Sequence, residues 1–208
     1  MAAQSASIPL RFQRAELEAK ADLTAEGRAL LGKIAHPERL VGALVDSGNR
    51  RDAVYALALM LPHRQAVWWA CMAARVLPDL ERRKQDLAAV SWAERWVQGG
   101  ASADAERAGE LANACDPDFA PAWVATAAYW SGPSIAPRGQ QAVPPAPHLP
   151  GVAARIALLL LSQDPALAGR IALGDWLEIG LALMSGGNGS QAQAELRGRL
   201  AVLKPAGQ

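Results

Sequence analysis

The sequence contains little of the residue types that build metal sites and disulfide frameworks. It has two cysteines and three histidines among 208 residues. Cys71 and Cys115 lie far apart, and His36, His63 and His148 are equally dispersed, with no CxxC or HExxH spacing. Because such sites need several ligands at short, regular intervals, we expect no metal and no cofactor. Cys71 lies in an apolar stretch and is interpreted as a small buried side chain.

An excess of charge of one sign is also missing. The chain has 21 Lys and Arg against 20 Asp and Glu, a formal net charge of +1. Binding to nucleic acid needs a basic stripe that neutralises phosphates. The densest basic runs, 50–51 and 82–84, have acidic residues close by. The sequence therefore predicts no nucleic-acid partner.

Long apolar runs are absent as well. The longest aliphatic runs, 156–161 and 179–184, are far shorter than the about 20 residues that cross a bilayer. Residues 1–11 lack the charged region followed by an apolar region that is typical of a signal peptide. We expect a soluble, cytoplasmic protein that does not bind a membrane.

Catalytic motifs are not found either. The sequence has no GxSxG element, and the glycine-rich stretch 186–189 lacks a Walker lysine and follows a helical pattern. We interpret that stretch as a turn that ends a helix. The best candidate acid–base pair is Asp175 and Glu178, three residues apart in an otherwise apolar pattern. We interpret the pair as the polar stripe of an amphipathic helix and expect that the protein is not an enzyme.

The sequence does contain the composition of a helical protein. Hydrophobic residues make up 51 % of it, and Ala and Leu supply much of this fraction while Val, Ile, Phe and Tyr are comparatively few. A nearly uninterrupted apolar stretch follows Pro62, and this helix is expected to be the axis around which the others pack. The predicted fold class is all-α, an irregular bundle of about eight helices in stacked antiparallel hairpins.

The clearest boundary in the chain is residues 131–150. Five of the 14 prolines lie between Pro133 and Pro147, and Pro150 follows. This composition predicts an extended, polyproline-like connection. The predicted organisation is an irregular N-terminal segment at 1–12, a main helical domain at 13–130, a proline-rich linker at 131–150, and C-terminal helices at 151–208 that pack on the main domain. We expect the last helices at 151–162, 166–184 and 190–203.

Tryptophan is unusually frequent, with seven residues against two Phe and two Tyr. A buried indole needs a hydrogen-bond partner, so tryptophan concentrates in cores with polar relief and at interfaces. We place Trp68 and Trp69 in the core because they lie in the apolar helix. Other tryptophans lie on more polar helices or near the linker, where they are available to a partner. The predicted partner-binding residues are Trp92, Trp96, Trp130 and Arg95.

Two motifs carry a resemblance. The first motif is residues 61–71, LPHRQAVWWAC. The second is residues 144–149, PPAPHL, which precede an apolar helical pattern. Over roughly residues 35–185 the chain resembles a family of uncharacterised bacterial all-helical proteins encoded near type VI secretion genes, among them spike-tip and effector-loading genes. The resemblance implies an accessory role in assembly of the apparatus or in cargo handling, and it implies no catalytic residues.

Three functions stay open at this point, and the third, beside the two that follow, is a purely structural helical module that holds two components together. The first is a non-enzymatic protein–protein interaction module, an adaptor or chaperone-like factor whose partner is another protein, such as a secretion effector or spike component. The alternative is a small-molecule-binding helical domain or enzyme, with a Trp-lined pocket in which Asp175 and Glu178 supply the polar groups.

Overall fold

The computed structural model describes residues 8–136 and 139–202. The regular elements in these ranges are all helical, eleven α-helices and two short 3-10 helices. The all-α class is confirmed, whereas the expected number of about eight helices is wrong. Asp22 (φ 51°), Pro37 and Gly48 (φ 81°) lie at the breaks that divide residues 14–60 into four short helices.

Most helices follow one another closely, and the longest connection joins α8 to α9. In chain order they are α1 (Arg14–Lys20), α2 (Ala25–Lys33), α3 (Pro37–Asp46), α4 (Arg50–Met60), α5 (His63–Ala74), η1 (Leu80–Arg82), α6 (Lys84–Gly99), α7 (Ser102–Ala114), α8 (Ala120–Tyr129), α9 (Leu149–Gln163), η2 (Leu173–Trp176), α10 (Leu177–Met184) and α11 (Ser190–Val202).

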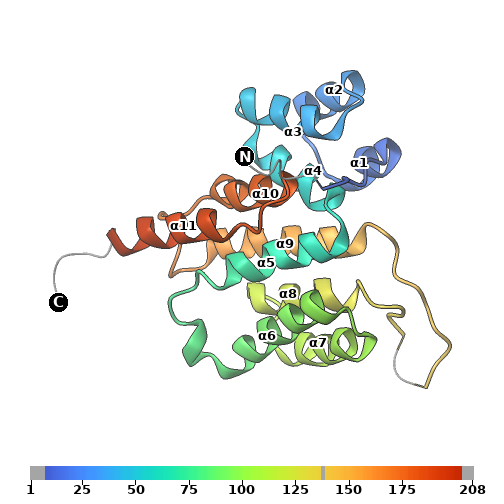
Figure 1. Ribbon diagram of the computed structural model, residues 1–208, viewed down its shortest axis with the longest axis vertical. Coiled ribbons are helices and arrows are strands. Elements are labelled where there is room, and N and C mark those ends of the chain that lie inside the picture. The colour runs from blue at the N-terminus through green and yellow to red at the C-terminus, as the bar shows by residue number, and fades with distance from the viewer. Residues whose placement is uncertain (1–7, 137–138, 203–208) are drawn as a thin grey trace, which may run out of the picture.

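Helices α5 and α9 lie side by side in the middle of the molecule (Figure 1). Helices α6, α7 and α8 cover them on one side, and α1 to α4 and α10 lie on the other. The central place of α5 follows from its sequence, since Ala66, Val67 and residues 69–74 are all buried. None of the helices described is both long and apolar enough to cross a membrane.

Two fully buried tryptophans join α5, η2 and α9. Trp69 Nε1 donates to the carbonyl oxygen of Trp176 at 2.9 Å, and Trp176 Nε1 donates to Oγ of Ser162 at 2.9 Å. Both side chains are 0 % exposed. An unpartnered N–H at either position would cost about 1–3 kcal/mol. Helix α10 packs directly on the first indole, because a β-carbon at Gly180 would lie 2.7 Å from the Trp69 ring.

The buried carboxylate of Asp52 fastens α2 to α4. Asp52 Oδ2 accepts hydrogen bonds from the backbone N–H of Thr24 at 2.9 Å and from its hydroxyl at 2.6 Å. Asp52 Oδ1 pairs with Arg51 at 3.1 Å. Thr24 in turn accepts from the N–H of Gly27 at 3.1 Å and so caps α2. The N-terminal helices are therefore attached to the bundle by polar contacts as well as by apolar packing.

Residues 166–184 do not form the single helix that we expected. Gly169 (φ 72°) lies in a turn, η2 follows, and α10 begins only at Leu177. The carboxylate of Asp175 accepts from the N–H of Ala172 at 2.7 Å and fixes the start of η2. A glycine in the left-handed region and a side-chain cap thus divide a sequence whose apolar spacing is helical throughout.

The proline-rich segment between α8 and α9 closes on itself instead of running straight. The N–H of Ile135 donates to the carbonyl oxygen of Val143 at 2.9 Å, and Ser134 Oγ accepts from the N–H groups of Ala136 and Val143 at 3.0 Å each. Helix α9, which follows the segment, packs along α8 and α5.

Gly151→Ala is expected to destabilise the protein, because α9 approaches the backbone of α4 at this residue. An added β-carbon would lie 2.3 Å from the carbonyl oxygen of Ala58. We expect a loss of about 1–3 kcal/mol in the free energy of unfolding, measured by urea denaturation.

The matched control is Gly42→Ala in the interior of α3. There an added β-carbon meets nothing within 4 Å, so the variant should gain up to about 1 kcal/mol. Equal stabilities of the two variants would contradict the close approach of α4 and α9.

Candidate functional site

Two of the predicted tryptophans, Trp92 and Trp96, lie four residues apart on α6. Trp96 is 7 % exposed and belongs to the core, whereas Trp92 is half-buried. The guanidinium of Arg95 lies over the Trp92 ring, 4.9 Å from its centroid. Nε of Arg95 also pairs with Oδ1 of Asp104 at 3.0 Å, which links α6 to α7. Arg95 is therefore engaged within the protein.

The fourth predicted residue, Trp130, follows α8 and packs against Trp123. Their ring centroids are 6.2 Å apart and the ring planes meet at 77°. Trp123 Nε1 donates to the carbonyl oxygen of Pro117 at 2.8 Å. The predicted partner-binding residues are thus divided between a core position, the Trp92–Arg95 stack and the Trp123–Trp130 pair.

The two carboxylates of the alternative hypothesis come together at one arginine. Arg199 of α11 binds Oδ1 of Asp175 and Oε2 of Glu178, each at 3.2 Å. These ion pairs fasten α11 to η2 and α10. The geometry is that of a clamp between helices, since both carboxylates face a cation of the protein itself.

Neither cysteine is placed to act as a nucleophile. Cys71 is fully buried, and this burial raises the pKa of its thiol well above the ordinary value. Burial and the neighbouring carboxylate of Asp86 raise the pKa of Cys115 to about 12. Within residues 8–136 and 139–202, no three His, Cys, Asp or Glu side chains gather closely enough to hold a metal ion.

His63 joins three segments of the chain at the start of α5. Its Nε2 lies 2.8 Å from Nη1 of Arg11 and 2.9 Å from the carbonyl oxygen of Pro147. Burial, and then the charge of Arg11, lower the pKa of His63 below the ordinary value. A neutral imidazole fits the contact with Arg11, because Arg11 can only donate and Nε2 then accepts. Nη1 of Arg11 also donates to the carbonyl oxygen of Pro147 at 2.9 Å and so bridges the two acceptors. The role of His63 is structural.

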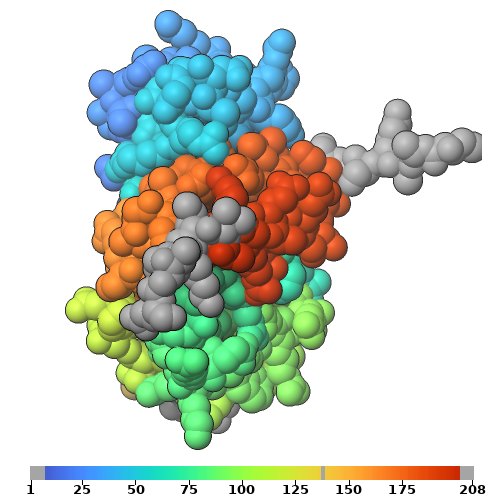
Figure 2. All heavy atoms as spheres, turned by 90° about the vertical axis from the view of Figure 1, so that its left-hand side faces the viewer, coloured from blue at the N-terminus to red at the C-terminus, as the bar shows by residue number. Residues whose placement is uncertain are grey.

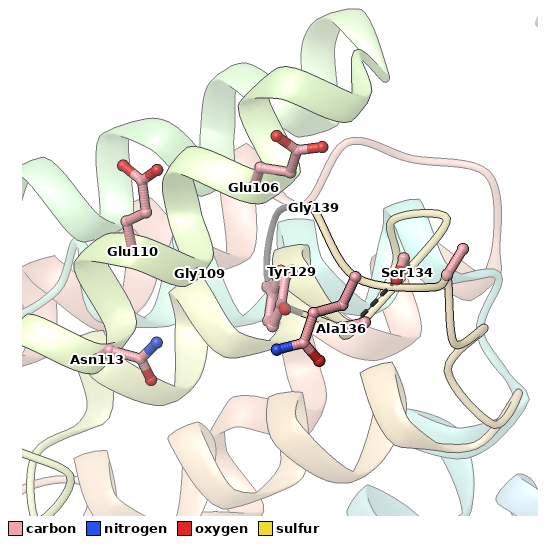
Figure 3. A pocket seen from close by; sticks show the side chains of 10 residues that line it. Glu106, Gly109, Glu110, Asn113, Tyr129, Ser134, Ala136 and Gly139 are labelled. Atoms are coloured by element: carbon pink, nitrogen blue, oxygen red, sulfur yellow. Dashed lines mark hydrogen bonds between the residues drawn. The ribbon is translucent and has the colours of Figure 1, made fainter.

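A polar hollow of about 510 Å³ lies between α7, the end of α8 and the loop at 134–142 (Figure 3). Glu106 and Glu110 stand on its α7 side, and the ring of Tyr129 lies at its floor. The ring fits there because Gly109 has no side chain, and a β-carbon at this position would lie 2.6 Å from the ring. The rim continues into a loop whose residues 137 and 138 lie outside the described ranges.

A second hollow of about 270 Å³ is more apolar and is built around Trp68. Trp68 is next to the buried Trp69, points about 100° away from it around α5, and is partly exposed. Its Nε1 donates to the carbonyl oxygen of Asn188 at 3.1 Å, which holds the ring in place. The residues that line this Trp68 hollow are Ile8, Arg64, Gln65, Trp68, Val97, Gln98, Leu183, Gly187 and Asn188.

A positive charge stands at the rim of the Trp68 hollow. Arg64 is exposed, and in the described part of the chain its hydrogen bond is to the carbonyl oxygen of Gln98 at 3.2 Å, at the end of α6. The partial negative charge of a helix C-terminus favours a cation there. Gln98 and Asn188 are exposed at the same hollow, and Gln65 is a further polar residue of its lining. An apolar floor within a polar rim is the arrangement found at the centre of protein interfaces.

Trp69 is fully buried in the core, as predicted, whereas Trp68 packs against the core and is only partly buried. The signal that separates them is the angle between adjacent side chains on a helix, which keeps two large rings from facing the same neighbour. Trp69 faces η2 and α10, and Trp68 faces the turn before α11. This turn completes a surface site that composition alone did not reveal.

Neither thiol is expected to react in the folded protein at pH 8. Because both thiol pKa values are raised, the thiolate, which is the reactive form, is a negligible fraction of either cysteine at that pH. Titration with Ellman's reagent should detect no thiol in buffer and both thiols in guanidinium chloride. Rapid labelling of one cysteine in buffer would contradict this assignment and return that cysteine to consideration as a nucleophile.

Acid is expected to destabilise the fold through His63. Since its folded-state pKa is lowered, the unfolded chain binds more protons in the window between the two pKa values. The stabilisation is complete above the unfolded pKa of about 6.5 and is lost as the pH falls through the folded value. Urea titrations at about pH 7.5 and about pH 5 span this window. Between these two pH values, the free energy of unfolding should fall less for His63→Gln than for the natural sequence. His36→Gln, at an exposed site, is the control, and identical slopes for the natural sequence and His63→Gln would exclude this role.

Comparison with known proteins identifies the family of the chain. Residues 40–184, from α3 to the end of α10, match a family described as a family of unknown function, DUF6931. No curated protein and no solved structure matches the chain. The matched range covers more than half of the 208 residues and contains α5 with both of its tryptophans. The chain therefore belongs to DUF6931, a family of unknown function.

Proposed function

We propose that the protein is a non-enzymatic adaptor or chaperone-like module that binds another protein through the Trp68 hollow. The observation that carries the proposal is an apolar hollow with a fixed, partly exposed indole inside a rim of amides and one arginine. Tryptophan and arginine are among the residues most enriched in the hot spots of protein interfaces.

The size and lining of the hollow favour a protein side chain as its occupant. Its volume of about 270 Å³ lies just below the range of about 300–1,000 Å³ that is usual for small-molecule sites. The indole N–H is already bonded to Asn188, so Trp68 offers a partner its apolar ring face. Among the described residues that line the hollow, Arg64 is the one titratable group, which leaves no pair of groups for acid–base chemistry.

The charge at the rim specifies the partner further. An aliphatic anchor residue would lie against Trp68, Val97 and Leu183, where the hollow is apolar. Arg64 has no carboxylate partner in the described part of the chain, so an acidic residue beside the anchor would complement it. The partner is therefore a protein segment with an aliphatic anchor and a neighbouring Asp or Glu.

The resemblance to proteins encoded near type VI secretion genes suggests the system in which the protein acts. On that basis we place the protein as an accessory factor that holds or delivers a secretion effector or a spike component. The alternative, a small-molecule site with Asp175 and Glu178 as its polar groups, is less favoured because both carboxylates bind Arg199.

The test begins with affinity purification of the tagged protein from its native host and mass spectrometry of what co-elutes. The stoichiometric partner is then purified, and its affinity is measured by calorimetry for the natural sequence and two variants. Trp68→Ala should weaken binding by about thirtyfold or more, the loss typical of a hot spot. Arg64→Glu should weaken it by about tenfold or more through charge reversal at the rim.

Two matched variants serve as controls. Trp123→Ala removes another partly buried tryptophan, and Arg39→Glu reverses another exposed arginine, and both should bind the partner as the natural sequence does. Arg64 is exposed, so a folding defect in Trp68→Ala leaves the charge-reversal test intact. Full affinity in both Arg64→Glu and Trp68→Ala, or the recovery of no stoichiometric partner, would overturn the proposal.

A further inference from the structure

A separate cleft of about 310 Å³ lies where α11 meets the end of α5 and the turn after α9. Figure 2 looks onto the side of the molecule where α11 (red) and the segment after α9 (orange) lie between the N-terminal helices (blue) and the part of the chain that follows α5 (green). The cleft combines three arginines with apolar walls. Its lining residues are Arg75, Val76, Leu77, Pro78, Arg170, Arg197, Leu200 and Ala201.

The first of these arginines is already paired. Nε and Nη2 of Arg75 bind the carboxylate of Glu94 at 2.8 and 2.6 Å, and Nη1 binds Glu81 at 3.2 Å. Nη2 also donates to Oγ of Ser91 at 3.1 Å. The charge of Arg75 is thus balanced, and its side chain forms a wall of the cleft.

The other two arginines bind backbone carbonyls and, in the described part of the chain, no carboxylate. Arg197 Nη2 donates to the carbonyl oxygen of Arg75 at 2.7 Å. Arg170 donates to the carbonyl oxygens of Leu200 and, at 3.5 Å, Ala166. A guanidinium has five N–H donors, and the hydrogen bonds to described residues use two of those of Arg170 and one of those of Arg197. Nε of Arg170 is buried and has no hydrogen-bond acceptor among the described residues.

Of these two arginines, Arg170 is partly buried and Arg197 is exposed, so it is Arg170, with its buried Nε, that calls for a bound anion. A partly buried charge without a counter-charge is unfavourable, and arginine at buried positions is normally paired. The planar guanidinium matches a carboxylate through two parallel hydrogen bonds. No Asp or Glu is among the described residues that line the cleft, and the carboxylates of Glu81 and Glu94 behind its wall are paired with Arg75.

The side chains of the cleft walls determine which second group a ligand needs beside its carboxylate. Val76, Leu77 and Pro78 follow α5, and Leu200 and Ala201 lie on the last turn of α11. Inorganic anions are strongly hydrated and gain nothing from these side chains, whereas an aliphatic chain is favoured there. The cleft therefore suits a molecule with a carboxylate at one end and an apolar body.

We propose that this cleft is a binding site for a small aliphatic carboxylate. Arg170 and Arg197 bind its carboxylate, and the aliphatic chain lies against Val76, Leu77 and Leu200. The site shares no lining residue with the Trp68 hollow, so it stands independently of the proposed adaptor function.

The experiment is calorimetric titration of the full chain with hexanoate, acetate, hexanol and inorganic phosphate. Hexanoate should bind saturably with one site per chain, and acetate and hexanol should each bind at least about tenfold more weakly, because each lacks one half of the ligand. Equal affinity for acetate and hexanoate, tighter binding of phosphate, or no binding of hexanoate would each overturn the proposal.

Variants locate the site. Arg197→Gln should weaken hexanoate binding by about tenfold or more, the loss of one charge-assisted contact, and Arg197 is exposed, so the fold is expected to survive. Arg170→Gln should have the same effect. Arg39→Gln, an exposed arginine of α3, is the matched control and should leave hexanoate affinity unchanged. Unchanged affinity in Arg197→Gln would show that hexanoate binds elsewhere and would overturn the assignment.

Discussion

The arrangement of the central helices depends on how two buried indoles satisfy their N–H groups. Trp69 on α5 donates to a main-chain carbonyl of η2, and Trp176 in η2 donates to a hydroxyl on α9. Helix α5 is far from η2 in the sequence, whereas η2 follows α9 after a short connection, and the two bonds link all three elements in the core. Helix α10 cannot slide along α5 without uncovering a donor, which would cost about 1–3 kcal/mol, and Gly180 lets it approach the ring that it covers.

This constraint in the core also produces the surface at Trp68. Once Trp69 is fixed, its neighbour must point about 100° away on the helix, toward the turn before α11. The carbonyl oxygen of Asn188 accepts from the Trp68 indole at 3.1 Å, and the side chain of Asn188 accepts from the N–H of Ser190 at 3.0 Å at the start of α11. The same turn therefore holds the indole and begins the helix. A ring held in this way has little freedom left to lose, and such preorganisation favours the affinity of a binding site.

The sequence predicted the helical class and the central apolar helix because both depend on local pattern. It did not predict the break at 166–176, since the apolar spacing there is helical and the left-handed glycine and the Asp175 cap act through backbone geometry. On α6, Trp92 and Trp96 look equivalent in the sequence. Trp96 falls with Ala89 and Ala93 on the buried face, and Trp92 at its edge. Arg170 and Arg197 of the cleft come from different elements. No rule of sequence spacing predicts that such residues lie close together.

Both surfaces described above depend on one helix that lies outside the matched family range of 40–184. The turn at 187–188 completes the Trp68 hollow, and Arg197, Leu200 and Ala201 complete the cleft at the other end of α11. Apolar burial on α11 comes from Ala192 and Leu196. Polar bonds supplement it, from Gln193 to the carbonyl oxygen of Met72, from Arg197 to that of Arg75, and from Arg199 to the two carboxylates. The family range supplies the central helices and the tryptophans, and the segment with α11 completes the Trp68 hollow and the cleft.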